Sequence, residues 1–391
     1  MIIKLPKTGS QPLELLEELT SDQRGAGVEV ELVTINSLEI KDPFDPEKID
    51  VKTKPMTVGL IMERVRGGDE EIDLMPDFQR RAGIWDGTRK SRLIESLLLR
   101  IPLPVFYVAA DQDDRWSVVD GLQRITTLKE FIHDKTLALQ GLEFLHHLNG
   151  NGFDDLSRQM QRRIQESEIT VHVIQPGTPP TVMFNIFKRI NTGGLPLSSQ
   201  EIRHAIKQGA ATKLLKKLAE SPEFKQATFN SIKDERMADR ECVLRFCAFY
   251  ITPPARYATG DLDALLIQTM DQINNWSTYK IAELEKAFKW AMKAAHLILG
   301  RAAFRKYYGK SFRLSPINKA LFEVWAVCLS KLSPQEVNYL IDKKSLVLQN
   351  FSKLMKDYDF VASISTATGT VTNVRRRFKE IEELINGALD A

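Results

Sequence analysis

Cysteine is scarce in this sequence, with only Cys242, Cys247 and Cys328 among 391 residues. None of them forms a C-x-x-C pair, and the first two lie in an apolar stretch with helical periodicity. A disulfide framework or a cysteine-rich metal site would need a different spacing. The pattern therefore predicts buried free thiols in a protein of the reducing cytosol.

Long hydrophobic runs and a charge excess of one sign are also absent. No run of eighteen or more apolar residues occurs, so we expect no membrane span. The first residues lack the apolar region of a secretion signal, which favours a cytoplasmic protein. The net charge of +3 is too small for a non-specific polycation, but it leaves room for a local basic face.

Several common catalytic motifs are missing as well. The sequence has no G-x-x-x-x-G-K-[ST] phosphate loop, no H-E-x-x-H and no G-x-S-x-G. His146 and His147 are adjacent, so their rings would point apart and are expected to be structural or solvated. We also find no convincing Ser-His-Asp set.

The hydrophobic pattern that is present predicts an α+β protein. Up to about residue 175 it alternates between short strands, such as Glu29–Ile35, and amphipathic helices; a hairpin is expected over 105–119. Beyond residue 179 the pattern is almost entirely helical. We predict a lead-in segment over residues 1–54, a mixed α/β domain over 55–210 and an all-helical domain over 211–391. The helices expected beyond residue 179 are 182–190, 199–207, 238–250, 261–273, 279–299, 318–329 and 371–385.

The most informative segment is Asp120-Gly121-Leu122-Gln123-Arg124. It lies between an apolar run and a periodic stretch, which predicts a strand, a tight turn and a helix start. Such a turn directs backbone N–H groups and the positive end of a helix dipole at one place, where an anion can bind. Arg124 would add a permanent cation. In the alternative interpretation, Asp120 caps the helix and Arg124 closes an internal ion pair.

Two further polar clusters accompany this turn. Gln79 and Arg80 follow a short strand, and alone they would suggest surface ion pairs. The segment from Phe187 to Ser198 predicts a helix that ends in a basic turn, then a Gly-Gly loop, then Ser198 as the next N-cap. Paired glycines allow a ligand to approach the backbone, although a solvated C-cap loop explains the same pattern. The polar and glycine residues concerned are Arg189, Asn191, Thr192, Gly193 and Gly194.

Two basic stretches in the C-terminal half have structural interpretations. Phe304–Arg313 interleaves rings and cations, which suits nucleic acid but equally suits rings packed inward with solvated charges. We expect the rings to pack inward. Arg375-Arg376-Arg377 is expected to be a solvated helix face.

Taken in order and spacing, several of these segments resemble one family. They are Phe78–Arg80, Leu93–Pro104, Asp120–Arg124 and Phe187–Arg203, and Asp239–Phe246 looks like a continuation. Over roughly residues 55–250 the chain resembles the GmrSD-type N-terminal domain of modification-dependent restriction systems. A related domain occurs in SspE-type phage-defence proteins.

The resemblance implies a ParB/sulfiredoxin-like α/β fold with helical additions. It also implies binding and hydrolysis of a nucleoside triphosphate with Mg²⁺, centred on a D-G-Q-Q-R motif. Leu122 replaces the first Gln of that motif here. The roles that the resemblance implies therefore apply to Asp120, Gly121, Gln123 and Arg124. The HNH-type nuclease domain of restriction members has no counterpart in this sequence. The chain thus looks like a stand-alone sensor or NTPase that works with a nuclease or another defence protein.

The resulting hypothesis assigns a role to each site residue. Arg124 and Arg80 would bind phosphate oxygens, Asp120 would hold Mg²⁺ or orient the attacking water, and Gln123 or Gln79 would position that water. Gly121 and the 189–194 loop would complete phosphate binding.

Two competing hypotheses stay open. In the first, the same turn holds a DNA backbone without turnover, in a DNA-binding or partner-recruiting scaffold. In the second, less favoured, the chain is a nuclease with an unrecognised metal site.

Overall fold

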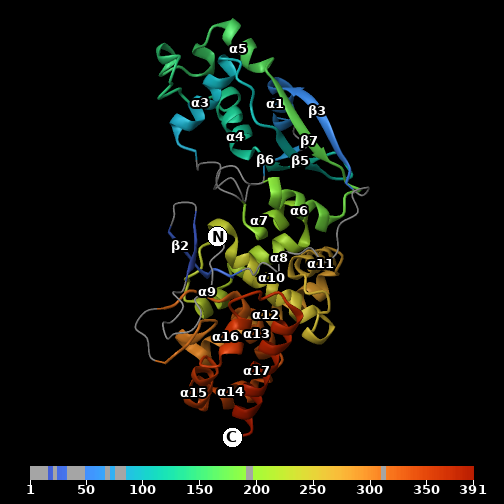
Figure 1. Ribbon diagram of the computed structural model, residues 1–391, viewed down its shortest axis with the longest axis vertical. Helices are drawn as coiled ribbons and strands as arrows, with labels where there is room; N and C mark the ends of the chain where they lie inside the picture. Colours follow the sequence, from blue (N-terminus) through green and yellow to red (C-terminus); the bar gives the residue numbers. More distant parts are fainter. Residues whose placement is uncertain are drawn as a thin grey trace. The chain divides into compact units, whose positions relative to one another are not determined.

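The computed structural model describes residues 16–20, 24–32, 49–66, 71–74, 85–190, 197–309 and 314–391. The chain forms two compact units. One consists of residues 44–206, and the other combines residues 1–43 with 207–391. The first unit is mixed α/β and the second is mostly helical, so the α+β class is confirmed (Figure 1).

The unit over 44–206 is built on a five-stranded mixed sheet with strand order β3-β7-β5-β6-β4. The pairs β3·β7 and β5·β6 are antiparallel, whereas β5·β7 and β4·β6 are parallel. The predicted hairpin is therefore confirmed. The strands are Val51–Thr57 (β3), Ile72–Asp73 (β4), Phe106–Ala110 (β5), Trp116–Asp120 (β6) and Glu168–Ile174 (β7).

Helices of this unit follow the amphipathic stretches of the sequence. They are Val58–Arg66 (α1), Gly87–Leu98 (α3), Leu122–Ile132 (α4), Arg158–Gln165 (α5), Pro180–Ile190 (α6) and Ser199–Ile206 (α7). Apolar side chains of α1, α3 and α4 form one core with alternate residues of the sheet, including Phe106, Val108 and Val171. Strand alternation therefore places Tyr107 and His172 on the opposite face.

The second unit is dominated by helices. They are Ala210–Ala219 (α8), Pro222–Thr228 (α9), Ala238–Ile251 (α10), Leu262–Asn274 (α11), Thr278–Leu299 (α12), Lys319–Ser330 (α13), Pro334–Asp342 (α14), Lys344–Leu354 (α15), Tyr358–Ser363 (α16) and Val371–Leu389 (α17). Helix α13 is buried on all sides, as its nearly continuous apolar sequence requires.

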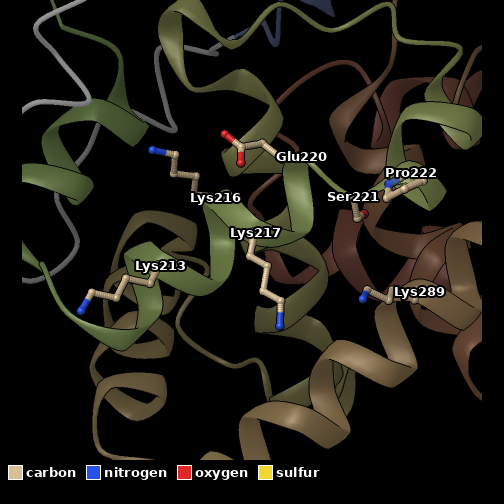
Figure 2. A pocket seen from close by; sticks show the side chains of 7 residues that line it. All are labelled: Lys213, Lys216, Lys217, Glu220, Ser221, Pro222 and Lys289. Carbon is tan, nitrogen blue, oxygen red and sulfur yellow. The ribbon is translucent and has the colours of Figure 1, made fainter.

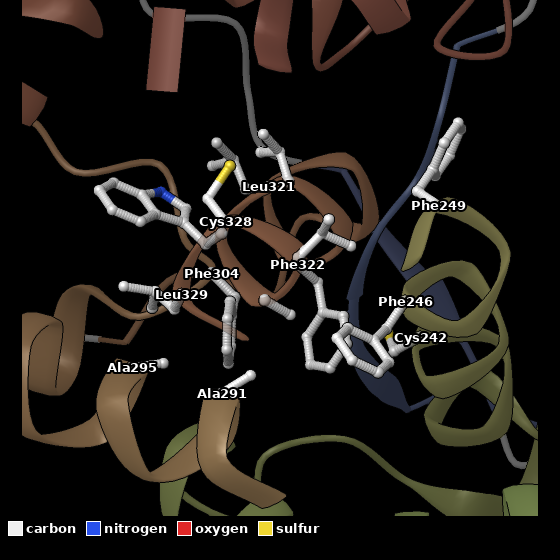
Figure 3. Packing of buried hydrophobic residues seen from close by; sticks show 14 of the residues in the cluster. Cys242, Phe246, Phe249, Ala291, Ala295, Phe304, Leu321, Phe322, Cys328 and Leu329 are labelled. Atoms are coloured by element: carbon white, nitrogen blue, oxygen red, sulfur yellow. The ribbon is translucent and has the colours of Figure 1, made fainter. Parts of the chain in front are cut away.

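Aromatic side chains fill the centre of the helical core. Phe304 and Phe322 have ring centroids 4.4 Å apart, and Phe246 lies 5.1 Å from Phe288. Cys242 and Cys328 lie among these side chains (Figure 3). All three cysteines are buried, as predicted.

The N-terminal segment joins this helical unit through a short hairpin, Glu17–Leu19 (β1) and Gly25–Glu29 (β2). The strand predicted over Glu29–Ile35 is wrong for Val30 and Glu31, because β2 ends at Glu29. Residues 33–35 of that prediction lie outside the described residues. The polar members of that alternating pattern bind buried cations with their side chains. Glu29 pairs with Lys306, and Glu31 accepts a 2.7 Å hydrogen bond from Arg245.

Two predictions about solvated charges in this unit were wrong. Arg377 is fully buried and donates a 2.8 Å hydrogen bond from Nε to Glu323, so it does not share a solvated face with its neighbours. Phe304 packs inward as expected, but Arg305 and Lys306 are buried too. Both reversals arise because carboxylates and carbonyls distant in sequence meet these cations inside the core.

Candidate functional site

The predicted strand–turn–helix at residues 116–132 is confirmed. Strand β6 ends at Asp120, Gly121 adopts a left-handed conformation with φ of +99°, and α4 begins at Leu122. A Cβ atom at Gly121 would lie 2.4 Å from Cδ1 of Phe106. Both the backbone angle and the close approach to this ring therefore require glycine at the turn.

The turn places the positive end of α4 directly after the strand. The first intrahelical bond runs from the Ile125 amide to the Gly121 carbonyl, at 2.9 Å. The amides of Leu122, Gln123 and Arg124 precede that bond and point toward the helix start. Among the described residues no side chain caps this end, so Asp120 does not fill the capping role considered for it. This is the geometry that favours a bound anion.

Arg124 points into the protein and is 7% exposed. Its guanidinium donates to the carbonyls of Pro104 and Val105 and forms a 2.9 Å ion pair with Asp120. It also lies 4.2 Å from the ring centre of Phe106. Burial lowers the pKa of Arg124, and the neighbouring carboxylate partly offsets this. The internal ion pair of the alternative interpretation is thus present. Arg124 also holds the two residues that precede β5 in place.

Asp120 and Gln123 occupy a different environment. The Asp120 side chain is 35% exposed, and its Oδ2 atom lies 2.9 Å from the Arg124 guanidinium. Gln123 is also partly exposed on the first turn of α4. Both side chains therefore retain exposed surface at the turn, although the Oε1 atom of Gln123 is buried.

The third polar cluster is connected to the turn through α7. Arg189 is exposed in the last turn of α6, whereas Asn191, Thr192, Gly193 and Gly194 lie outside the described residues. Ser198 then begins α7 as predicted: its hydroxyl accepts from the Glu201 amide at 3.2 Å, and the Glu201 carboxylate accepts from the Ser198 amide. Helix α7 packs against both α6 and β6.

Helix α7 buries a set of polar side chains that the sequence did not single out. Gln200, Glu201, Arg203 and His204 are all buried, although nothing in their spacing distinguishes them from a solvated face. Arg203 donates a 3.1 Å hydrogen bond to Gln200 and lies 5.3 Å from the ring centre of Phe184 on α6. Only the packing of α7 reveals this cluster.

The second polar cluster cannot be placed, because Gln79 and Arg80 lie outside the described residues. Within the described ranges, no group of three or more His, Cys, Asp or Glu side chains is arranged to hold a metal ion. His146 and His147 are both exposed.

No helix in the described part of the chain is long and apolar enough to cross a lipid bilayer.

A lysine-lined pocket of about 490 Å³ lies in the helical unit, between α8, the start of α9, and α12. Its lining consists of Lys213, Lys216, Lys217, Glu220, Ser221, Pro222 and Lys289 (Figure 2). The ammonium groups of Lys217 and Lys289 share Glu285, at 2.7 and 2.8 Å. The pocket is therefore basic even with this carboxylate beside it.

No curated protein and no solved structure matches the chain. Residues 62–207 match the family model of the GmrSD restriction endonuclease, N-terminal domain. The matched segment begins within α1 and ends one residue after α7, so it includes the 120–124 turn and both helices of the third polar cluster. The match agrees with the family resemblance predicted from the sequence, and it is confined to residues 62–207.

Proposed function

We propose that this protein is a component of a restriction or phage-defence system and that its 44–206 unit binds a nucleoside triphosphate at the 120–124 turn. The match to the GmrSD restriction endonuclease N-terminal domain supports the biological setting. The observation that carries the binding site is the start of α4, where Gly121 turns the chain and no side chain of the described ranges caps the helix. Phosphate groups are well suited to such a helix start.

The inward position of Arg124 changes its proposed role. We assign it as a positioning residue that holds Pro104, Val105 and Asp120 around the turn. Phosphate oxygens would be bound by the first-turn amides of α4, and Arg189 is proposed as an additional cation. Asp120 would hold Mg²⁺ or orient water, and Gln123 would position that water. Gln79, Arg80 and the 191–194 loop remain proposed contributors.

The test is phosphate release from ATP, GTP, CTP and UTP with Mg²⁺, alongside binding of each nucleotide. Asp120→Asn keeps the side-chain shape but removes its charge, so hydrolysis should fall about 100-fold or more. Asp134→Asn is a matched control, since this carboxylate pairs with Lys129 near the other end of α4. A wild-type chain that binds none of the four nucleotides would overturn the proposal. Binding without turnover would support the binding site and would indicate that Leu122, in place of the first Gln of the motif, prevents hydrolysis.

DNA binding is a second candidate function, and the lysine-lined pocket specifically favours it. Four lysines from two helices of one unit surround the pocket. Lysine contacts to phosphate release counterions, so affinity for DNA should fall steeply as salt rises. A Lys213→Gln, Lys216→Gln double variant should weaken binding and lower the salt slope by about 2. A Lys353→Gln, Lys356→Gln control on α15 and just beyond it should change neither.

A further inference from the structure

The register of the sheet places four chemically notable residues in one row that leads to the turn. Thr53 on β3 is the cross-strand partner of His172 on β7. His172 is in turn the partner of Tyr107 on β5, and Tyr107 is the partner of Asp120 at the end of β6. These four strands are neighbours in the sheet (Figure 1). The row thus connects an aromatic pair to the first residue of the proposed phosphate site.

Three side chains of the row contact one another directly. The Thr53 hydroxyl lies 2.9 Å from Nδ1 of His172. The ring centroids of His172 and Tyr107 are 5.0 Å apart, with their planes tilted by 45°. The hydroxyl of Thr53 therefore fixes the orientation of the imidazole beside the phenol ring.

This aromatic pair retains accessible surface. His172 and Tyr107 are each partly exposed, whereas their strand neighbours Phe106, Val171 and Val173 are buried in the core on the other face. Rings that serve only to fill a core would be buried like those neighbours. The pair instead presents aromatic surface outside that core.

The distance from the turn suits a nucleotide. Adjacent strands lie about 4.8 Å apart, so Tyr107 is roughly one strand spacing from Asp120 and His172 roughly two. A ligand with its phosphates at the start of α4 can extend its base over this part of the sheet. Aromatic side chains bind bases of any identity by stacking, because every base has a π face.

We infer that Tyr107 and His172 form the stacking platform for the base of the nucleotide whose phosphates bind at residues 120–124. The inference rests on the proposed function and adds the part of the site that distinguishes a nucleotide from an inorganic polyphosphate. Thr53 is a positioning residue that acts through His172. If the four residues had only a structural role, their side chains would stabilise the pairing of the strands and would not affect ligand affinity.

The experiment compares two probes, the preferred nucleoside triphosphate and inorganic tripolyphosphate, by calorimetric titration with Mg²⁺ on the full chain. Tyr107→Thr and His172→Thr retain a strand-forming residue but remove a ring. Each should raise the Kd for the nucleotide roughly 5- to 100-fold and leave the Kd for tripolyphosphate unchanged. Tyr107→Phe retains the ring and should bind like the wild type. Thr170→Ala, two residues from His172 on β7, is the matched control.

The outcomes separate this inference from the proposed function. Unchanged nucleotide affinity in folded Tyr107→Thr and His172→Thr chains would overturn the platform while leaving the phosphate site intact. Equal wild-type affinity for nucleotide and tripolyphosphate would do the same. A wild-type chain that binds neither probe would overturn both. Urea unfolding of each variant checks folding, and Tyr107→Leu replaces Tyr107→Thr if the latter does not fold.

Discussion

Several individual residues in the helical unit carry charge at fully buried positions. Arg245 contacts Glu31 and Glu241, and Arg377 contacts Glu323 together with the carbonyls of Ser363 and Thr368. Cations buried in this way are tolerated because each meets carboxylates or carbonyls with suitable geometry. A single missing partner would leave an uncompensated charge in a low-dielectric environment.

Asp239 is a buried carboxylate whose environment opposes its charge. Burial raises the pKa of Asp239 to about 6, although the Arg240 amide donates to it at 2.8 Å. The folded chain therefore holds this proton more tightly than the unfolded chain, where the pKa is about 3.9. Between pH 4 and pH 6 the group lowers the free energy of unfolding as pH rises, and the loss persists above pH 6.

Asp239→Asn should remove this pH-dependent loss. We expect the variant to be about 2–3 kcal/mol more stable than the wild type at pH 7, with the two converging near pH 4. Urea unfolding at both pH values measures the difference. An equal difference at pH 4 and pH 7 would contradict the assigned titration.

The three thiols should be unreactive in the folded protein. Burial raises the pKa of Cys247 and Cys328 to about 12, and that of Cys242 also lies far above its ordinary value. Since the thiolate is the reactive form, Ellman's reagent should label none of the three in the native chain and all three in guanidinium. Rapid labelling without denaturant would show that one of these helices opens readily.

At the scale of elements, Glu95 anchors a long loop to helix α3. Its carboxylate is buried and accepts hydrogen bonds from the amides of Glu143, Phe144 and Leu145, at 2.8–3.0 Å. Burial alone would raise the pKa of Glu95, but these three amides hold it below its ordinary value. The charge therefore fixes the loop between α4 and α5 from one point on a helix.

Glu95→Gln should loosen that loop, because the neutral amide has only one acceptor oxygen. We expect a loss of about 2–4 kcal/mol in the free energy of unfolding. Hydrogen exchange should accelerate at the amides of residues 143–145. Glu143→Gln is the control, since its exposed pair with Arg92 should contribute less than about 1 kcal/mol. Equal effects of the two substitutions would refute the anchoring role.

At the scale of the whole molecule, the second unit is assembled from the two ends of the chain. Its N-terminal segment supplies Glu18, Glu29 and Glu31, which pair with Lys319, Lys306 and Arg245 of the helices. Backbone bridges join Val28 to Ile317 and Leu32 to Thr366. The segment is therefore an integral part of the helical unit.

Glu31→Ala should destabilise this unit although the residue lies far from the helices in sequence. It removes the partner of Arg245 and the acceptor of the Thr368 hydroxyl, so we expect a loss of about 2–4 kcal/mol. Denaturant unfolding provides the measurement. Glu382→Ala breaks an exposed pair with Lys331 and should cost less than about 1 kcal/mol. A Glu31→Ala chain as stable as this control would show that the N-terminal segment is dispensable.

The sequence alone determined the local structure and the matched family. A single glycine between an apolar run and a periodic stretch predicted the turn at 121. Periodicity predicted the helices α6, α7, α10, α11, α12, α13 and α17. These features depend on neighbouring residues, so a linear pattern contains them. The ordered set of short motifs likewise predicted the GmrSD-type domain.

Only the tertiary structure decided which polar side chains point inward and which residues become neighbours. Arg124 and Arg377 have the sequence environment of surface cations. Both are nevertheless buried, because each donates hydrogen bonds to carbonyl or carboxylate oxygens distant in sequence. The pair of Glu31 and Arg245 spans 214 positions, and the row from Thr53 to Asp120 spans four strands. Such contacts depend on strand order and helix packing, which periodicity does not encode.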